Sequence, residues 1–160
     1  MRLLKIICIA GALMLSQLSL AAVTEAPAVK LPTLQGKFDL EKLHGKVVYL
    51  DFWASWCIPC RQSFPWMNEM QARYHDSGLE VVAVNLDKNR ALADEFLKKL
   101  EANFTVAFDA QGDSAKAYNL RGMPSSYLIG RDGKLYASHI GFREKDKAKI
   151  EQAIQQLLNQ

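Results

Sequence analysis

The chain has 160 residues, of which 49% are hydrophobic, so its length fits one domain with a substantial core. Its formal net charge is +3. Two of its 20 basic side chains, Arg2 and Lys5, precede an apolar run and are expected to be removed with it, which leaves 18 basic against 17 acidic residues. This near balance excludes an electrostatic case for nucleic-acid binding.

Residues 1–21 have the pattern of a secretory signal peptide. A basic start leads into the short apolar run Ile6–Leu15, and Ser19-Leu20-Ala21 then supplies small residues at the cleavage spacing. Cleavage is expected after the last of these or after Ala22. An uncleaved membrane anchor is disfavoured, because polar residues interrupt the run and a spanning helix needs about 20 apolar residues.

Removal of this leader changes the cysteine count. Cys8 lies inside the apolar run, and no cysteine stands at the cleavage point, so a lipoprotein is not expected. The mature chain keeps Cys57 and Cys60, in a compartment that permits disulfides. A bridge between them would close a very short loop and contribute little stability. The pair is therefore better explained by a chemical role than by stabilisation of the fold.

Residues 22–33 are interpreted as an extended linker that precedes a domain over residues 34–160. A short hairpin or strand is expected between Leu34 and Leu43. Val47–Phe52 is mostly apolar on both alternating sets of positions, which predicts a central strand covered on both faces. A helix is expected from Cys57 to about Ser77.

The rest of the chain alternates between strand and helix signals. In chain order these are a strand Leu79–Leu86, a helix Ala91–Glu101, a strand Phe104–Asp109, a short helix Asp113–Tyr118 capped by Asp113 or Ser114, a hairpin of strands Ser126–Ile129 and Lys134–Ile140, and a helix Glu144–Leu158. This order predicts an α/β fold with a mixed central sheet and helices on both faces.

The motif Cys57-Ile58-Pro59-Cys60 stands where the central strand passes into a helix. A Cys-x-x-Cys at such a junction is specific for a redox dithiol. Unpaired N–H groups and the positive end of the dipole at the helix start would stabilise the thiolate of Cys57. Cys57 is therefore expected to be the attacking, exposed sulfur, and Cys60 the more covered sulfur that resolves the mixed disulfide.

A metal site is the competing interpretation of the two cysteines. Zinc needs four nitrogen or sulfur ligands, whereas the chain has no second cysteine pair and its histidines are scattered. His44, His75 and His139 are thus interpreted as ordinary polar residues. Copper(I) needs fewer and softer ligands, so transient copper binding by the dithiol stays open as an alternative.

Asp51 is a charged residue in an otherwise apolar strand. It is either a strand-end residue that reaches solvent or a buried acid whose pKa is forced up. The second interpretation points to a functional group, because perturbed buried acids concentrate at functional sites.

The segment from Asp51 to Cys60 resembles the active-site segment of the thioredoxin superfamily. Pro65, the turn Gly122-Met123-Pro124 and Gly141 match the family as well. The additional helix and strand over residues 91–109, together with the leader, resemble the exported TlpA/ResA-like thioredoxins of bacteria. The likeness covers the chain from about Leu31 onward.

This resemblance implies roles for several residues. Asp51 would lie beneath the cysteines and accept the proton of Cys60. The Met123-Pro124 bond would be cis and face the disulfide, leaving the backbone of Met123 free to pair with an extended substrate. Trp56 would wall the site, and Trp56 and the dipeptide Ile58-Pro59 are expected to bind substrate.

One departure concerns an acid that several relatives carry after the second strand of the fold. They have a helper glutamate there, where this chain has Asn85-Leu86-Asp87-Lys88. Either Asp87 substitutes for it or the role is absent.

The function that follows is an exported, periplasmic thiol-disulfide oxidoreductase without cofactor or metal. The resemblance favours a monomeric reductase of disulfides in periplasmic proteins or apocytochrome c, supplied by a membrane thiol donor. The insert is also too short for the helical domain of strongly oxidising exported relatives. Two alternatives remain: a copper(I)-binding chaperone module that uses the same dithiol, and a disulfide oxidant or isomerase.

Overall fold

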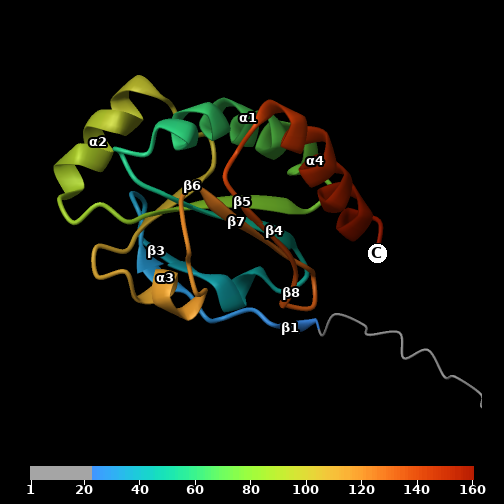
Figure 1. The fold of residues 1–160 in the computed structure, drawn as a ribbon. Helices are drawn as coiled ribbons and strands as arrows, with labels where there is room; N and C mark the ends of the chain where they lie inside the picture. Colours follow the sequence, from blue (N-terminus) through green and yellow to red (C-terminus); the bar gives the residue numbers. More distant parts are fainter. Residues whose placement is uncertain (1–22) are drawn as a thin grey trace, which may run out of the picture.

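The computed structural model describes residues 23–160, whose centre is a six-stranded mixed sheet in the order β1-β8-β7-β4-β5-β6 (Figure 1). Strands β4, β5 and β6 are parallel, and β7, β8 and β1 extend the sheet antiparallel to their neighbours. The strands span β1 Thr24–Glu25, β4 Val47–Trp53, β5 Leu79–Asn85, β6 Thr105–Phe108, β7 Ser125–Ile129 and β8 Lys134–Ile140.

Helices cover both faces of the sheet, as the sequence predicts. One face packs against three helices and the other against a short helix, a 3₁₀ turn and a small hairpin. The elements of the first face are α1 Ile58–Tyr74, α2 Arg90–Lys99 and α4 Glu144–Leu158, and those of the second are α3 Asp113–Ala117, η1 Leu40–Leu43, β2 Lys30–Pro32 and β3 Lys37–Asp39.

Strand β4 is buried along its whole length because alternate side chains enter two different cores. The side chains on the α1 face are those of Val47, Tyr49 and Trp53, and those on the α3 face are Val48, Leu50 and Phe52. By this alternation Asp51 belongs to the α1 face. The predicted central strand is therefore confirmed, and it places an acid among apolar side chains beneath α1.

The region predicted as an additional helix and strand forms α2 and β6. Asn89 caps α2, since its side chain accepts a hydrogen bond from the backbone N–H of Ala91. Phe96 of α2 packs on Trp53 and Phe64, with ring centroids 4.6 and 4.9 Å apart. The insert thus closes the core beside the start of α1.

The expected linker over residues 22–33 is wrong for the residues that the structure describes. Residues 24–25 form β1 on the edge of β8, and residues 30–32 form β2 of the small hairpin. Val29 is only 1% exposed and belongs to the core on the α3 face. The domain therefore begins before residue 34, because these short segments gain their stability from partners that lie far away in the sequence.

The cap of α3 also differs from the prediction. Its N-cap position is Gly112, with φ of 73°, and neither Asp113 nor Ser114 caps the helix with its own side chain. The carboxylate of Asp109 instead accepts hydrogen bonds from the first N–H groups of this helix. Backbone at positive φ favours glycine, which explains why Gly112 stands at the turn.

The expected signal peptide over residues 1–21 and Cys8 lie outside the described residues. Within residues 23–160, no helix is both long and apolar enough to cross a membrane.

Candidate active site

The parallel strands β4, β5 and β6 all end at the same edge of the sheet, where open α/β folds place their functional groups. The chain leaves β4 at Trp53, makes a short turn and enters α1 at Ile58. Cys57 is the N-cap residue of α1, with extended backbone and no side-chain cap. The cysteine sulfur therefore lies where the helix presents unpaired N–H groups.

Cys57 and Cys60 form a disulfide, with their Cα atoms 5.3 Å apart. Cys57 retains 4% exposure and Cys60 none, so the predicted order of accessibility holds although both residues are buried. Pro59 occupies the first turn of α1, where the missing N–H has no partner in the helix. A substrate sulfur would therefore meet Cys57 first.

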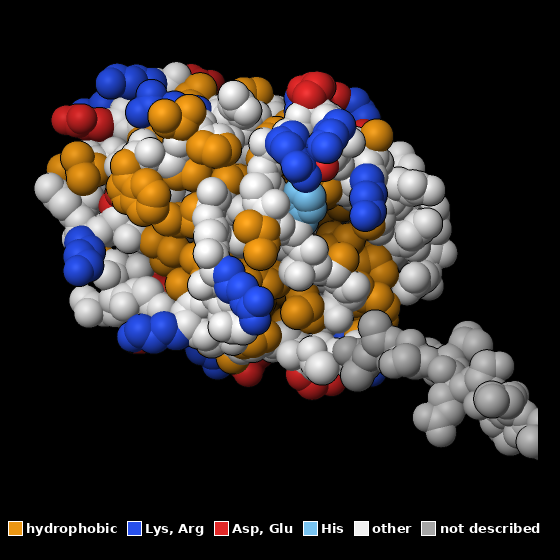
Figure 2. Space-filling view, in the orientation of Figure 1, with side chains coloured by type: hydrophobic (Ala, Val, Ile, Leu, Met, Phe, Trp, Pro, Cys, Tyr) orange, Lys and Arg blue, Asp and Glu red, His pale blue; other side chains and the backbone are white. Residues whose placement is uncertain are grey.

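The two residues next to Cys57 in the sequence carry large, exposed apolar side chains. Trp56 is 68% exposed and Ile58 is 73% exposed, which are the highest values among the exposed large hydrophobic side chains. A groove of about 610 Å³ runs from Trp56 to α2, where Leu92 and Phe96 line it. Figure 2 shows hydrophobic side chains gathered on this side of the molecule. Exposed apolar surface of this kind is typical of a docking site.

Asp51 lies in β4 on the α1 face, in the layer that also holds the cysteines. It is 1% exposed, and its Oδ2 atom has no hydrogen-bond partner among the described residues. Burial raises the pKa of this carboxyl well above its usual value. Asp51 is therefore a buried acid and not a strand-end residue that reaches solvent.

The surroundings of Asp51 follow from the register of the sheet. Its partners are Ala83 in β5 and Ser126 in β7. Tyr49 lies two residues earlier on the same face, and its pKa is raised well above the usual value, first by burial and then by the charge of Asp51. Among residues 23–160, no basic side chain forms an ion pair with the carboxylate of Asp51.

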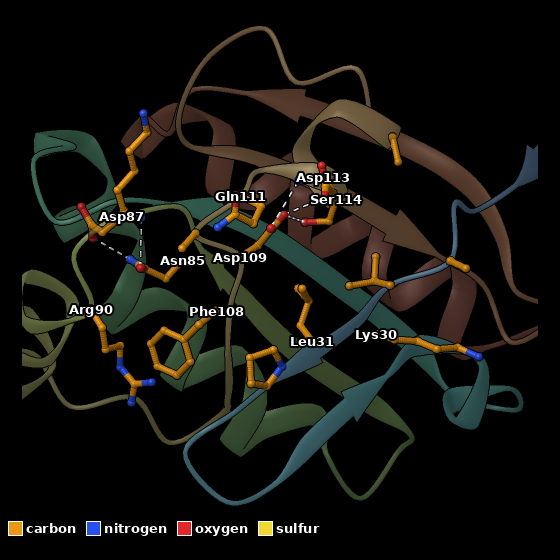
Figure 3. A pocket seen from close by; sticks show the side chains of 16 residues that line it. Lys30, Leu31, Asn85, Asp87, Arg90, Phe108, Asp109, Gln111, Asp113 and Ser114 are labelled. Carbon is orange, nitrogen blue, oxygen red and sulfur yellow. Dashed lines mark hydrogen bonds between the residues drawn. The ribbon is translucent and has the colours of Figure 1, made fainter.

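Asp87 holds the loop that precedes Cys57, and its contact with Asn85 is seen in Figure 3. The backbone N–H and the hydroxyl of Ser55 each donate to its carboxylate at 2.9 Å. Asn85 donates to the same carboxylate at 2.7 Å, and the N–H of Asp87 donates back to Asn85 at 3.1 Å. These bonds engage both oxygens of Asp87, so its observed contacts are those of a loop anchor. No local pattern indicates Ser55 as the anchored residue.

The turn before β7 lies at the same edge. The Met123–Pro124 peptide bond is cis, as the resemblance implied. The carbonyl of Pro124 accepts a hydrogen bond from Gly141 at 2.8 Å, and the Ser125 hydroxyl donates to Gly122 at 2.7 Å. Within residues 23–160, the backbone of Met123 makes no hydrogen bond. Its side chain packs against the core cluster that contains both cysteines.

Of the predicted site residues, Cys57 and Cys60 are bonded to each other, and Met123 packs against the cluster that contains them. Among the described residues, no three His, Cys, Asp or Glu side chains are grouped as metal ligands would be.

Comparison with known proteins agrees with this geometry. The model of the Redoxin family matches residues 21–154. ResA of Bacillus thuringiensis subsp. konkukian, a thiol-disulfide oxidoreductase, is 34% identical over 134 residues, which are 83% of this chain and 76% of ResA. ResA of Bacillus subtilis is 34% identical over 118 residues, or 73% of this chain and 66% of that protein.

Solved structures give the same result. A Chlorobium tepidum protein described as a thiol:disulfide interchange protein DsbE is 52% identical and superposes with a TM-score of 0.84, covering 88% of this chain and 99% of that one. The exposed lipoprotein thioredoxin Etrx1 of Streptococcus pneumoniae is 30% identical, with a TM-score of 0.71 and coverage of 82% and 100%. The chain therefore belongs to the Redoxin family, as a ResA-like thiol-disulfide oxidoreductase with a thioredoxin fold.

Proposed function

We propose that this oxidoreductase is an exported reductase of disulfides in periplasmic proteins or apocytochrome c, that a membrane thiol donor restores its dithiol, and that it acts as a monomer. The observation that carries the proposal is the Cys57–Cys60 pair at the start of α1, in the same layer as the unpartnered buried carboxyl of Asp51. The expected signal peptide supports the location.

The reaction begins with the thiolate of Cys57, which attacks one sulfur of the substrate disulfide. That bond breaks, a mixed disulfide forms, and the second substrate sulfur leaves as a thiolate. Cys60 then transfers its proton to Asp51 and attacks the sulfur of Cys57. The mixed disulfide breaks, the substrate leaves with both sulfurs reduced, and Cys57–Cys60 holds the new bond.

Electrostatics favour the reducing direction. Strong oxidants of this fold stabilise the thiolate of their reduced form, which makes the disulfide easy to reduce. Here Ile58-Pro59 supplies neither charge nor a side-chain donor to Cys57. The guanidinium of Arg61 faces the carbonyl of Ser55 at 3.4 Å and the ring of Phe96. Ionised Asp51 disfavours a second negative charge nearby. The reduced dithiol is therefore weakly stabilised and gives up its electrons readily.

Substrate docking follows from the exposed surface around the disulfide. Trp56 and Ile58 offer apolar contact area, and the backbone of Met123 offers an unpaired N–H and C=O to an extended segment. We expect Trp56→Ala to raise the KM for a protein disulfide several-fold while the reaction with a small aromatic disulfide stays near the wild-type rate.

Insulin reduction tests the proposal, with wild type compared with Cys57→Ser and Cys60→Ser. Wild type should turn over with a thiol donor, Cys57→Ser should be inactive, and Cys60→Ser should accumulate the mixed disulfide. Absence of dithiol-dependent turnover, together with tight binding of copper(I), would favour the chaperone module instead.

A further inference from the structure

A row of polar side chains crosses the sheet from Asp51 to its edge. Asp51 of β4 is in register with Ser126 of β7, and Ser126 is in register with His139 of β8. Directly opposed residues in antiparallel strands point to the same face, with Cβ atoms about 4.5–5.5 Å apart. His139 contacts Asp146 of α4, which identifies this face as the one that carries α1 and α4.

The two ends of this row are unsatisfied. In residues 23–160, three buried side-chain polar atoms lack a hydrogen-bond partner, and two of them are Oδ2 of Asp51 and Nε2 of His139. Nε2 of His139 lies 3.4 Å from Oδ2 of Asp146 but is not aligned for a hydrogen bond. Buried polar atoms without partners are uncommon and call for an explanation.

A cavity of about 190 Å³ connects the far end of the row to solvent. Tyr49, Ser126 and His139 line it on the inside, and exposed Ala137 and Ser138 line its mouth. One water occupies about 30 Å³ of liquid, so the cavity has room for several, and its polar lining suits them. Ser126, which is 5% exposed, separates this space from Asp51.

We propose that Ser126, the cavity and His139 form the route by which the proton that Asp51 takes from Cys60 leaves for solvent. The inference rests on the proposed function, because it needs Asp51 to accept that proton. Ser126 is the residue that the register of β4 and β7 places directly opposite the buried carboxyl.

Each step of the route conserves protons and involves no electron transfer. Asp51 donates to the hydroxyl of Ser126, which passes its own proton to a water in the cavity. The imidazole of His139 accepts a proton at Nε2 and releases it at the surface, so neither residue is consumed. Asp51 returns to the carboxylate form and is ready for the next resolution step.

The titratable and charged groups around the route lie at its two ends. Tyr49 and the cysteines face Asp51 from β4 and α1. At the outer end, Asp146 faces His139 from α4 with Arg143 bound to it at 2.7 Å, and Lys149 of α4 lines the cavity. The carboxylate of Asp146 would favour a transient positive charge on the imidazole.

The test follows sulfur and proton separately in one turnover. Reduced protein is mixed with a chromophoric aromatic disulfide in weak buffer that contains a pH indicator dye, above the pKa of Asp51 found by infrared titration. In wild type, we expect the coloured thiolate released by Cys60 and the dye signal to appear together. In Ser126→Ala and His139→Gln, the dye signal should appear at a rate about tenfold lower than that of the coloured thiolate. Added imidazole should remove the lag in His139→Ala.

His75→Gln is the matched control, because His75 lies exposed beyond the last turn of α1, away from the row, and the dye and chromophore should stay together. Coincident signals in Ser126→Ala and His139→Gln, or equal slowing of both signals, would overturn the route.

Asp51→Asn separates the proton route from the proposed role of Asp51 in resolution. If it slows thiolate release but neither row variant delays the dye, only the route fails. If it changes nothing, the role of Asp51 fails and the route fails with it.

Discussion

Two buried aspartates, one on each face of the sheet, have opposite environments. Asp51 on the α1 face is 1% exposed, and its Oδ2 atom has no partner among the described residues. Asp109, which follows β6 on the α3 face, is 5% exposed, and both of its oxygens accept hydrogen bonds (Figure 3). Its donors are the N–H groups of Gly112, Asp113 and Ser114 at 2.9, 3.2 and 2.8 Å, and the hydroxyl of Ser114.

The two pKa shifts follow from these environments. Burial raises the pKa of Asp51 well above its usual value, and no hydrogen bond opposes it. Burial also acts to raise the pKa of Asp109, but the bonds from Ser114, Gly112 and Asp113 outweigh it, and the pKa is lowered. Burial alone therefore does not identify a chemical group. An acid without partners is prepared to exchange a proton, whereas an acid with partners holds a helix in place.

The largest expected effect comes from Asp51→Asn, which removes the proton acceptor and keeps the side-chain shape. Resolution of a mixed disulfide on Cys57 should slow about 100-fold, the lower range for loss of a general base. Stopped-flow release of a chromophoric thiol measures this rate. The unfolding midpoint should not fall, because no hydrogen bond to the carboxyl is lost; unchanged kinetics would make Asp51 a structural residue.

Asp109→Ala should show the reverse pattern. Removal of the carboxylate leaves several donors at the start of α3 without a partner, which should lower the free energy of unfolding by about 2–4 kcal/mol. Urea unfolding measures the loss, and the resolution rate of the folded protein should stay near that of wild type. A large loss of rate with unchanged stability would contradict the contrast between the two acids.

Stability should respond to pH in opposite ways at the two sites. Because the folded-state pKa of Asp51 is raised, its contribution is fully present below the unfolded pKa of about 3.9 and is lost as pH rises through the folded value. Because the folded-state pKa of Asp109 is lowered, its contribution is present above about 3.9 and is lost as pH falls through the folded value.

Unfolding free energies over a range of pH test these signs. Asp51→Asn should remove a decline in stability that begins as pH rises above about 3.9, and Asp109→Asn should remove a decline that begins as pH falls below about 3.9. Identical pH slopes in wild type and Asp51→Asn would mean that this carboxyl has the same pKa in the folded and unfolded chain.

The smallest effect concerns Asp87, a third buried acid, which anchors the active-site loop. Ser55→Ala removes the hydroxyl bond to Asp87 but keeps the bond from the backbone N–H. A loss of about 0.5–1.5 kcal/mol in unfolding free energy is expected, with at most a several-fold change in rate. Thermal unfolding and insulin reduction measure both. A loss of rate as large as that of Asp51→Asn would instead assign chemistry to this loop contact.

Long periodic segments were predictable from the sequence. The helix Glu144–Leu158 and the strand Lys134–Ile140 have the predicted bounds, because their apolar spacing and the turn at residues 131–133 define them locally. The short strands within residues 22–33 were missed because two or three residues have no readable period. Their strand character depends on partners in β8 and β3.

The site was predictable in part, and for identifiable reasons. The cysteines and their order of burial follow from a strand-to-helix junction, while the cis bond at Pro124 followed only from the family resemblance. Asp109 replaces the expected caps because its carboxylate reaches forward from the preceding strand. His139 had no assigned role, since its alignment with Asp51 depends on strand register across three strands, which no local pattern specifies.

The reduction potential of the Cys57–Cys60 couple tests the proposed direction most directly. Equilibration with a glutathione or dithiothreitol series, read by thiol alkylation, gives this value. A weakly stabilised thiolate predicts a potential near or below about −270 mV, the value for thioredoxin. A potential near about −120 mV, the value of the strongest oxidant of this fold, would contradict a reductase and favour a disulfide oxidant.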